Sequence, residues 1–212
     1  MQQAQLFGAS RFPAGFVYEP EFVTPDDETA LITVIQDLPL REAQYKQYTA
    51  KRRIVSYGGR YDFSSNELMP AGSIPDFLHP LRERIAQWTG IAVTEWNHAL
   101  VAEYAPGTQL GWHRDVPEFE AIVGVSLAGT CRMRLRPYPP RKGRDPDALA
   151  FTIEPRSVYS MRDDSRWRWQ HAISPTKDLR YSITFRTMNA AGRPRAHNGK
   201  ATRHGGGRAS VR

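Results

Sequence analysis

The chain has 212 residues, of which 40% are hydrophobic, and a formal net charge of +7. This length suits one well-buried domain and leaves little room for a second. Cys131 is the only cysteine, which excludes an internal disulfide or a cysteine-rich zinc site, and no apolar run has the length of a signal peptide or a membrane span. We therefore expect a monomeric, cytoplasmic protein that does not enter a membrane.

The first part of the chain is expected to contain two helices. Residues 1–22 have the composition of an irregular, aromatic-rich lead-in. Thr24 is followed by proline and three acidic residues, the pattern of a helix start, and predicts a helix over 25–37. Apolar residues at helical spacing predict a second helix over 75–89. Between the two helices, the Tyr, Phe and Gly residues of 52–65 indicate a β-ribbon or a loop.

From residue 96 onward the sequence consists of short β-rich runs separated by turn residues. Two helices followed by many short strands indicate a mainly β fold, a sandwich or barrel with the helices packed on one face. The predicted strands cover 96–104, 122–127, 131–136, 151–154, 157–161, 168–173 and 180–187.

The C-terminal stretch carries most of the net charge. Residues 189–212 contain no acidic residue and are poor in large apolar residues, so we expect a disordered basic tail. Such a tail could bind a phosphate backbone loosely, or it could be a solubilising extension. Its basic residues are Arg193, Arg195, Lys200, Arg203, Arg208 and Arg212.

An H-x-D motif, His113-Arg114-Asp115, is the first candidate for chemistry. In a strand, residues i and i+2 point to the same face, so the imidazole and the carboxylate could meet one metal ion. A distal histidine would complete the 2-His-1-carboxylate triad that is typical of non-haem Fe(II) oxygenases. His171 lies downstream in a run with strand character and is the candidate for that third ligand.

Two arginines follow the distal histidine. Arg180 and Arg186 are separated by an even number of residues in RYSITFR, so both side chains could project from one face of a strand. A guanidinium group binds a carboxylate with two parallel hydrogen bonds and stays charged when it is buried. The pair is therefore suited to a dicarboxylate co-substrate, although two surface arginines would show the same spacing.

In this order the motifs resemble the AlkB family of Fe(II)- and 2-oxoglutarate-dependent dioxygenases. VAEYAPGTQLGWHRD, residues 101–115, is similar to the family's segment that leads into H-x-D, and RYSITFR resembles its R-x-N/S-x-T-F-R signature. The resemblance implies a double-stranded β-helix, or jelly roll, as the dioxygenase core over 97–188. It places a substrate-recognition lid and the helices within 1–96 and leaves 189–212 as the tail.

The resemblance also implies roles for individual residues. The two histidines and Asp115 named above would be the catalytic ligands of Fe(II). Arg180 would bind the distal carboxylate of 2-oxoglutarate, and Arg186 would lie near the end that chelates iron. Tyr104 would donate a hydrogen bond to the co-substrate, and Ser182 stands where the family often has Asn. Dioxygen would be the second co-substrate.

Two positions depart from the pattern of the nucleic-acid repair members of that family. Ala102 replaces an Asn that helps to bind 2-oxoglutarate. Pro117 replaces an acidic residue that recognises a methylated base, and Glu118 follows it directly. The iron and co-substrate machinery is therefore better supported by the sequence than base recognition.

Aromatic and basic residues indicate a nucleic-acid partner. Tyr57, Tyr61, Phe63 and Trp112 could stack on a flipped base, or they could belong to the core. In the run 131–136, arginines alternate with apolar residues, which gives the strand one cationic face, and a basic loop follows over 141–144. That face is either a phosphate contact or an ordinary solvated surface. The arginines are Arg132, Arg134 and Arg136, and the loop adds Arg141, Lys142 and Arg144.

Three functions are compatible with the sequence. The first is oxidative demethylation of alkylated DNA or RNA, in which an N-methyl group is hydroxylated and leaves as formaldehyde, while 2-oxoglutarate becomes succinate and carbon dioxide. The second is the same chemistry on a protein side chain or a small metabolite. The third, from another class, is a non-catalytic nucleic-acid-binding module.

Overall fold

The computed structural model describes residues 12–45, 48–62, 65, 67–141, 143 and 147–189. The secondary-structure elements of these residues are, in chain order, β1 (Phe16–Glu19), α1 (Pro25–Gln36), β2 (Arg41–Tyr45), β3 (Tyr48–Tyr57), β4 (Arg60–Asp62), β5 (Glu67–Met69), the 3-10 turn η1 (Asp76–Leu78), α2 (His79–Thr89), the 3-10 turn η2 (Val93–Glu95), β6 (Trp96–Tyr104), β7 (Leu110–His113), β8 (Phe119–Ala128), β9 (Cys131–Pro137), β10 (Leu149–Ile153), β11 (Val158–Met161), α3 (Asp163–Trp167), β12 (Trp169–Ile173) and β13 (Arg180–Met188).

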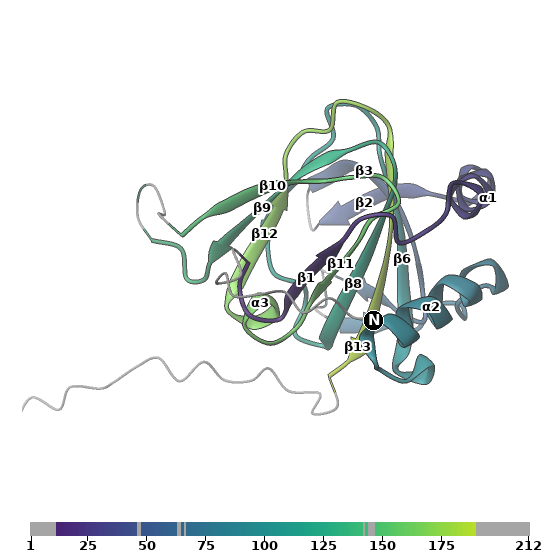
Figure 1. Cartoon of the computed structure of the whole chain (residues 1–212), viewed down its shortest axis with the longest axis horizontal. Coiled ribbons are helices and arrows are strands. Elements are labelled where there is room, and N and C mark those ends of the chain that lie inside the picture. The colour runs from purple at the N-terminus through teal and green to yellow at the C-terminus, as the bar shows by residue number, and fades with distance from the viewer. Residues whose placement is uncertain are drawn as a thin grey trace, which may run out of the picture.

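Two antiparallel sheets form the body of the molecule. The larger has the strand order β1-β11-β8-β13-β6-β3-β2, and the smaller has the order β10-β9-β12-β7. Figure 1 shows the smaller sheet on one side of the larger one, with α1 and α2 on the other side. The predicted mainly β fold, a jelly roll with helices on one face, is confirmed.

Both predicted helices are present, and local signals fix where they begin. At the start of α1, the Thr24 hydroxyl accepts a hydrogen bond from the Asp27 amide, and the Asp27 carboxylate accepts one from the Thr24 amide. This capping box satisfies amides that have no partner within the helix. In α2, Pro80 lies in the first turn, where no backbone N–H is needed, and Gly90 ends the helix at a φ of 72°.

Two apolar clusters hold the layers together. One lies between the helices and the larger sheet and includes Ile35, Ile85 and Val101. The other lies between the two sheets and includes Met133 and Ile173. Because strand side chains alternate between faces, the larger sheet contributes to both clusters, and on its inner face the polar residues of β13 lie beside the second cluster.

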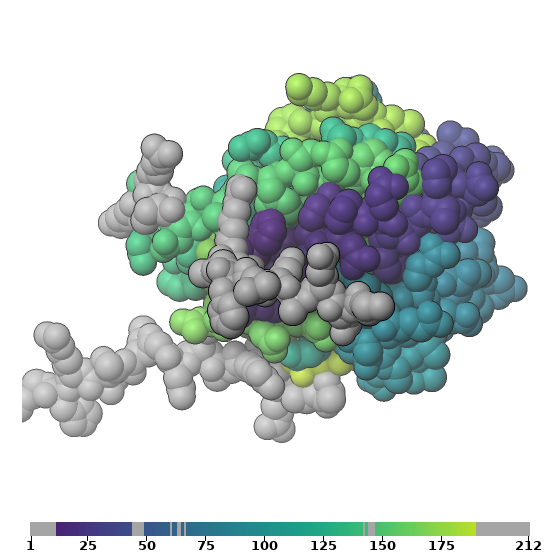
Figure 2. Space-filling model, viewed as in Figure 1, coloured from purple at the N-terminus to yellow at the C-terminus, as the bar shows by residue number. Residues whose placement is uncertain are grey.

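The N-terminal part differs from the expectation of an irregular lead-in. β1 pairs with β11, and β3 pairs with β6, so the larger sheet continues across residue 96. Figure 2 shows the first described residues, in purple, lying across the surface between the teal region that contains α2 and the green strands of the second half. α3 was not predicted, and β7 was expected only through the H-x-D motif at its end, because a five-residue helix and a four-residue strand are too short to show a period.

No helix in the part of the chain that the structure describes is long and apolar enough to cross a membrane.

Candidate active site

A cavity between the two sheets brings together the residues that the sequence analysis selected as metal and co-substrate ligands. The larger sheet contributes a row of polar side chains from β13 and one tyrosine from β6, and the smaller sheet contributes two histidines from β7 and β12. Of the predicted residues, the cavity is lined by Tyr104, His113, Asp115, His171, Arg180, Ser182 and Arg186, and the departing residue Ala102 lines it as well.

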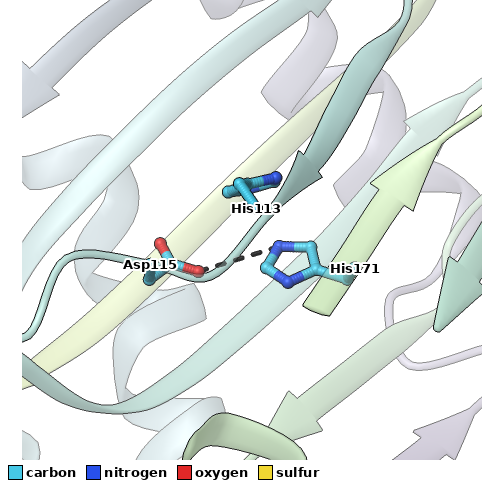
Figure 3. A group of neighbouring side chains, drawn as sticks. All are labelled: His113, Asp115 and His171. Carbon is cyan, nitrogen blue, oxygen red and sulfur yellow. Dashed lines mark ion pairs between the residues drawn. The ribbon is translucent and has the colours of Figure 1, made fainter. Parts of the chain in front are cut away.

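The three predicted metal ligands converge, although they come from separate parts of the chain (Figure 3). His113 and His171 are register partners on β7 and β12, with ring centroids 4.1 Å apart. His171 Nε2 lies 3.7 Å from Asp115 Oδ2, and the candidate ligand atoms of all three residues lie within 4.8 Å of one another. Two imidazoles and one carboxylate at this spacing could hold a divalent iron ion.

The expectation that both residues of the H-x-D motif lie in a strand is correct only for His113. β7 ends at His113, so Asp115 belongs to the loop that follows. Pro117, two residues later, has no amide hydrogen and cannot continue the ladder. Asp115 reaches the histidines from this loop because its carboxylate is bound by a residue of the opposite sheet.

That residue is Arg186. Its Nη2 and Nε atoms lie 2.8 Å and 2.9 Å from Asp115 Oδ1, and Nε donates a hydrogen bond. Oδ2, the other oxygen, faces His171. His113 is oriented in a similar way, because its Nδ1 lies 2.9 Å from the Gly111 carbonyl, to which it can donate. Its Nε2 is then left as the metal-binding nitrogen.

The charges and the burial in the cavity set the protonation states of the three candidate metal ligands. Burial opposes ionisation of Asp115, but the positive charges around it, led by Arg186, outweigh burial and lower the pKa of the carboxyl. Burial lowers the pKa of both His113 and His171. At neutral pH the site therefore presents one carboxylate and two neutral imidazoles, the protonation states that metal binding requires.

Arg180 is the cation at the other end of the cavity. It is 1% exposed, and its Nε donates a hydrogen bond to Ser126 Oγ at 2.9 Å. Its guanidinium carbon lies 5.0 Å from the centre of the Tyr104 ring. A second buried arginine, Arg52, donates to the Tyr104 hydroxyl at 3.4 Å. This end of the cavity is thus positively charged and suited to a carboxylate.

Tyr159 is a cavity residue that the sequence analysis missed. It lies on β11, is 8% exposed, and faces Gly124 on β8. A Cβ atom at Gly124 would collide with the Tyr159 ring, so the ring crosses β8 at a position where only glycine leaves space. Burial raises the pKa of Tyr159 well above its usual value, which keeps the hydroxyl protonated.

His98 is a second missed residue, located behind Arg186. It is 4% exposed, and its Nδ1 lies 3.4 Å from Arg186 Nη1. Burial, followed by the charge of Arg186, lowers the pKa of His98 to about 3, and a hydrogen bond with the Gly59 backbone opposes that shift. Neutral His98 therefore connects the turn between β3 and β4 to the arginine that holds Asp115. Only its alternation with other buried residues on β6 could have indicated this position.

The predicted substrate residues do not line this cavity. Trp112 lies beside the arginines of β9, and Tyr57 packs against the cluster under the helices. Tyr61 is close enough to Glu118 for its charge to raise the pKa of Tyr61, in addition to the larger effect of burial. Phe63 lies outside the described residues.

The sequence matches a family model described as the 2OG-Fe(II) oxygenase superfamily over residues 24–191. An uncharacterized protein of Acanthamoeba polyphaga mimivirus is 30% identical over 192 residues, which cover 82% of this chain and 85% of that protein. An alkylated DNA repair protein ALKBH8 homolog of Arabidopsis thaliana is 28% identical, covering 75% of this chain but only 50% of that protein. A probable RNA/DNA demethylase ALKBH6 of Danio rerio is 26% identical, covering 76% of this chain and 70% of that protein.

The fold is also similar to a solved structure. The structure of OsALKBH1 superimposes with a TM-score of 0.64 at 17% identity, covering 83% of this chain and 98% of that one. The family model spans most of the sequence and includes all three candidate ligands. The chain therefore belongs to the 2OG-Fe(II) oxygenase superfamily, as an AlkB-like dioxygenase that uses Fe(II), 2-oxoglutarate and dioxygen.

Proposed function

We propose that this dioxygenase removes methyl groups oxidatively from alkylated nucleic acid. The observation that carries the proposal is the cavity itself, which is lined by His113, Asp115 and His171 together with Arg180. Two of the relatives have names that refer to alkylated DNA repair or to RNA/DNA demethylation, which gives the substrate class.

In this proposal the three clustered residues hold the iron, and Arg180 binds the distal carboxylate of 2-oxoglutarate. Tyr104 and Ser182 provide hydroxyl groups along the co-substrate, and Arg186 keeps Asp115 oriented. When bound, iron and 2-oxoglutarate supply the activation of dioxygen that hydroxylates the N-methyl carbon. The protein contributes position and the exclusion of water from the cavity.

Glu118 is our candidate for base recognition in place of the acid that Pro117 replaces. Its Oε2 is buried and accepts no hydrogen bond within the described part of the chain. A buried carboxylate oxygen without a donor is costly, and the amino group of a base would supply one. Tyr61, whose pKa responds to Glu118, would lie beside that base.

The same chemistry on a protein side chain or a metabolite is the second candidate. The absence of an acidic residue at Pro117 favours it, and the basic surface opposes it. The third alternative, a non-catalytic module, is disfavoured because the family and the complete ligand set both indicate an enzyme.

We also propose a cytoplasmic monomer that contacts phosphates through the arginines of β9, the 141–144 loop and the basic tail. Lys142, Arg144 and residues 190–212 lie outside the described residues, so the loop and the tail stay sequence-based predictions.

The test is to incubate the iron-loaded protein with methylated single- and double-stranded oligonucleotides and 2-oxoglutarate, and to measure methyl loss by mass together with succinate. Demethylation that Asp115→Asn abolishes is the expected result. Succinate formation with a methylated peptide or metabolite, and with no oligonucleotide, would assign the enzyme to the second candidate.

A further inference from the structure

The outer face of the smaller sheet carries a set of side chains that the active site does not use. His113 and His171 point into the cavity, so their strand neighbours Trp112 and Gln170 point outward. On β9 the buried residues alternate with arginines in the same way. The outward residues of three adjacent strands thus form one surface.

Trp112 crosses this surface to reach the arginines of β9. The guanidinium carbons of Arg134 and Arg136 lie 4.9 Å and 4.3 Å from the centre of its ring. β12 runs between β7 and β9, and its outward residue there is Ala172, which is fully covered. A small residue at this place leaves room for the indole to lie across β12.

Hydrogen bonding and a second aromatic ring fix further guanidinium planes. Arg136 Nε donates to Gln170 Oε1 at 2.8 Å. At the end of β7, the guanidinium carbon of Arg114 lies 3.8 Å from the centre of the Tyr138 ring, and Arg114 Nη1 donates to the Trp167 carbonyl at 2.9 Å. These contacts hold the arginines flat, so less rotational entropy is lost when they bind a ligand.

The face has a strongly one-sided charge. β7, β9, β10 and β12, all of which the structure describes in full, contain no Asp or Glu. Arg132 adds an exposed cation beside the two that contact Trp112. Guanidinium groups that are held in fixed orientations among aromatic rings are suited to bind a polyanion that also carries planar rings, such as the bases of a nucleic acid.

We propose that this cationic-aromatic face binds the single-stranded nucleic acid on either side of the nucleotide that enters the cavity. The face is formed by Trp112, Arg114, Arg132, Arg134, Arg136 and Tyr138. The arginines contact phosphates, and unpaired bases stack on the guanidinium and aromatic planes. Trp112 and Arg114 flank His113 directly in the chain, so the face begins where the metal site ends. The inference rests on the proposed function for its substrate class.

The test measures the affinity of the full-length, metal-loaded protein for a fluorescent, unmethylated single-stranded oligonucleotide at several salt concentrations without dioxygen. The double variant Arg134→Gln/Arg136→Gln should reduce the slope of log affinity against log salt by about 1.4, because each phosphate contact on a single strand contributes about 0.7. Arg41→Gln/Lys177→Gln, which removes the same charge from exposed positions that are not part of this face, is the matched control and should change the slope less.

Trp112→Ala should weaken binding by about two- to thirty-fold at every salt concentration, with the slope retained, because the charges stay while their support is lost. Trp112→Phe keeps a ring and should restore most of the affinity. Equal slopes for the two double variants would overturn the proposal. The proposal would also be overturned if a polyglutamate peptide bound as tightly as the oligonucleotide and if Trp112→Ala bound that peptide with unchanged affinity.

Succinate release with methylated oligonucleotides is measured in parallel, because it tests the proposed demethylase function separately from the proposed binding face. If the face variants bind normally while the enzyme demethylates, the face is wrong and the function stands. If no methylated nucleic acid is turned over but the face variants lose oligonucleotide binding as described, the proposed function is wrong and the face stands.

Discussion

Replacing Arg180 by alanine tests the co-substrate end of the cavity. The wild-type guanidinium is 1% exposed, is fixed by Ser126, and lies against Tyr104. In our assignment it faces the distal carboxylate of 2-oxoglutarate. The variant would leave that carboxylate buried without its ionic partner, while the three metal ligands on the other side of the cavity stay in place.

The expected loss follows from the burial of Arg180. Removing one partner of a buried ion pair costs about 3–5 kcal/mol, which corresponds to an affinity at least about a hundred-fold weaker. Arg180→Lys should recover only part of this loss, because an ammonium group cannot form two parallel hydrogen bonds with a carboxylate. Ser126→Ala removes only the hydrogen bond to Nε and should weaken binding by about ten-fold, or about 1.4 kcal/mol.

The assay is the dependence of succinate release on 2-oxoglutarate concentration, supported by calorimetric titration of the iron-loaded protein. Thermal unfolding and iron content measured on the same samples separate a loss of co-substrate binding from a loss of fold or metal. Near-normal 2-oxoglutarate affinity in Arg180→Ala would refute the assignment, and so would equal affinities in the alanine and lysine variants.

Three further outcomes are expected. Asp115→Asn should lower iron affinity by more than ten-fold, because a neutral amide replaces the anionic ligand; metal titration checks this, and unchanged iron content would contradict it. Gly124→Ala should destabilise the fold by about 1–3 kcal/mol through collision with the Tyr159 ring, and the double variant Gly124→Ala/Tyr159→Leu should recover part of that loss in denaturant unfolding. The metal-free protein should lose stability as pH falls below about 6.5, because burial lowers the pKa values of His113, His171 and His98, so the unfolded chain binds protons first; the pKa of His98 is about 3 when folded and near 6.5 when unfolded. His98 contributes about 1.4 kcal/mol per pH unit to the pH dependence of the free energy of unfolding, and an equally steep pH dependence in His98→Gln would contradict this contribution.

The sequence predicts the strands of the core well, because their apolar patterns are strong. The run 96–104 coincides with β6, and 180–187 differs from β13 by one residue. The even spacing of Arg180 and Arg186 predicted that both lie on one face of a strand, and the central position of β13 in the larger sheet turns that face toward the cavity.

The residues that the sequence could not identify depend on contacts between distant strands. Tyr159 enters the cavity because Gly124, on the neighbouring strand, has no side chain, and neither residue belongs to a motif. His98 and Arg52 read as ordinary strand residues until β6 and β3 are placed in the same sheet. Asp115 fits its motif, but it lies in a loop, and its carboxylate is held in place by the guanidinium of Arg186 from the opposite sheet.

The two departures from the AlkB pattern are each accompanied by a nearby polar group. Ala102 removes an amide from the cavity wall, yet Tyr159 brings a hydroxyl into the same cavity from β11, and its raised pKa keeps that hydroxyl a donor. Pro117 removes an acid, yet Glu118 follows with a buried oxygen that accepts no hydrogen bond within the described residues. A donor for a carboxylate and an acceptor for a base amine are therefore both present, on different backbone positions. Loss of 2-oxoglutarate affinity in Tyr159→Phe, and of methylated-oligonucleotide turnover in Glu118→Gln, would show that the positions moved while the chemistry was kept.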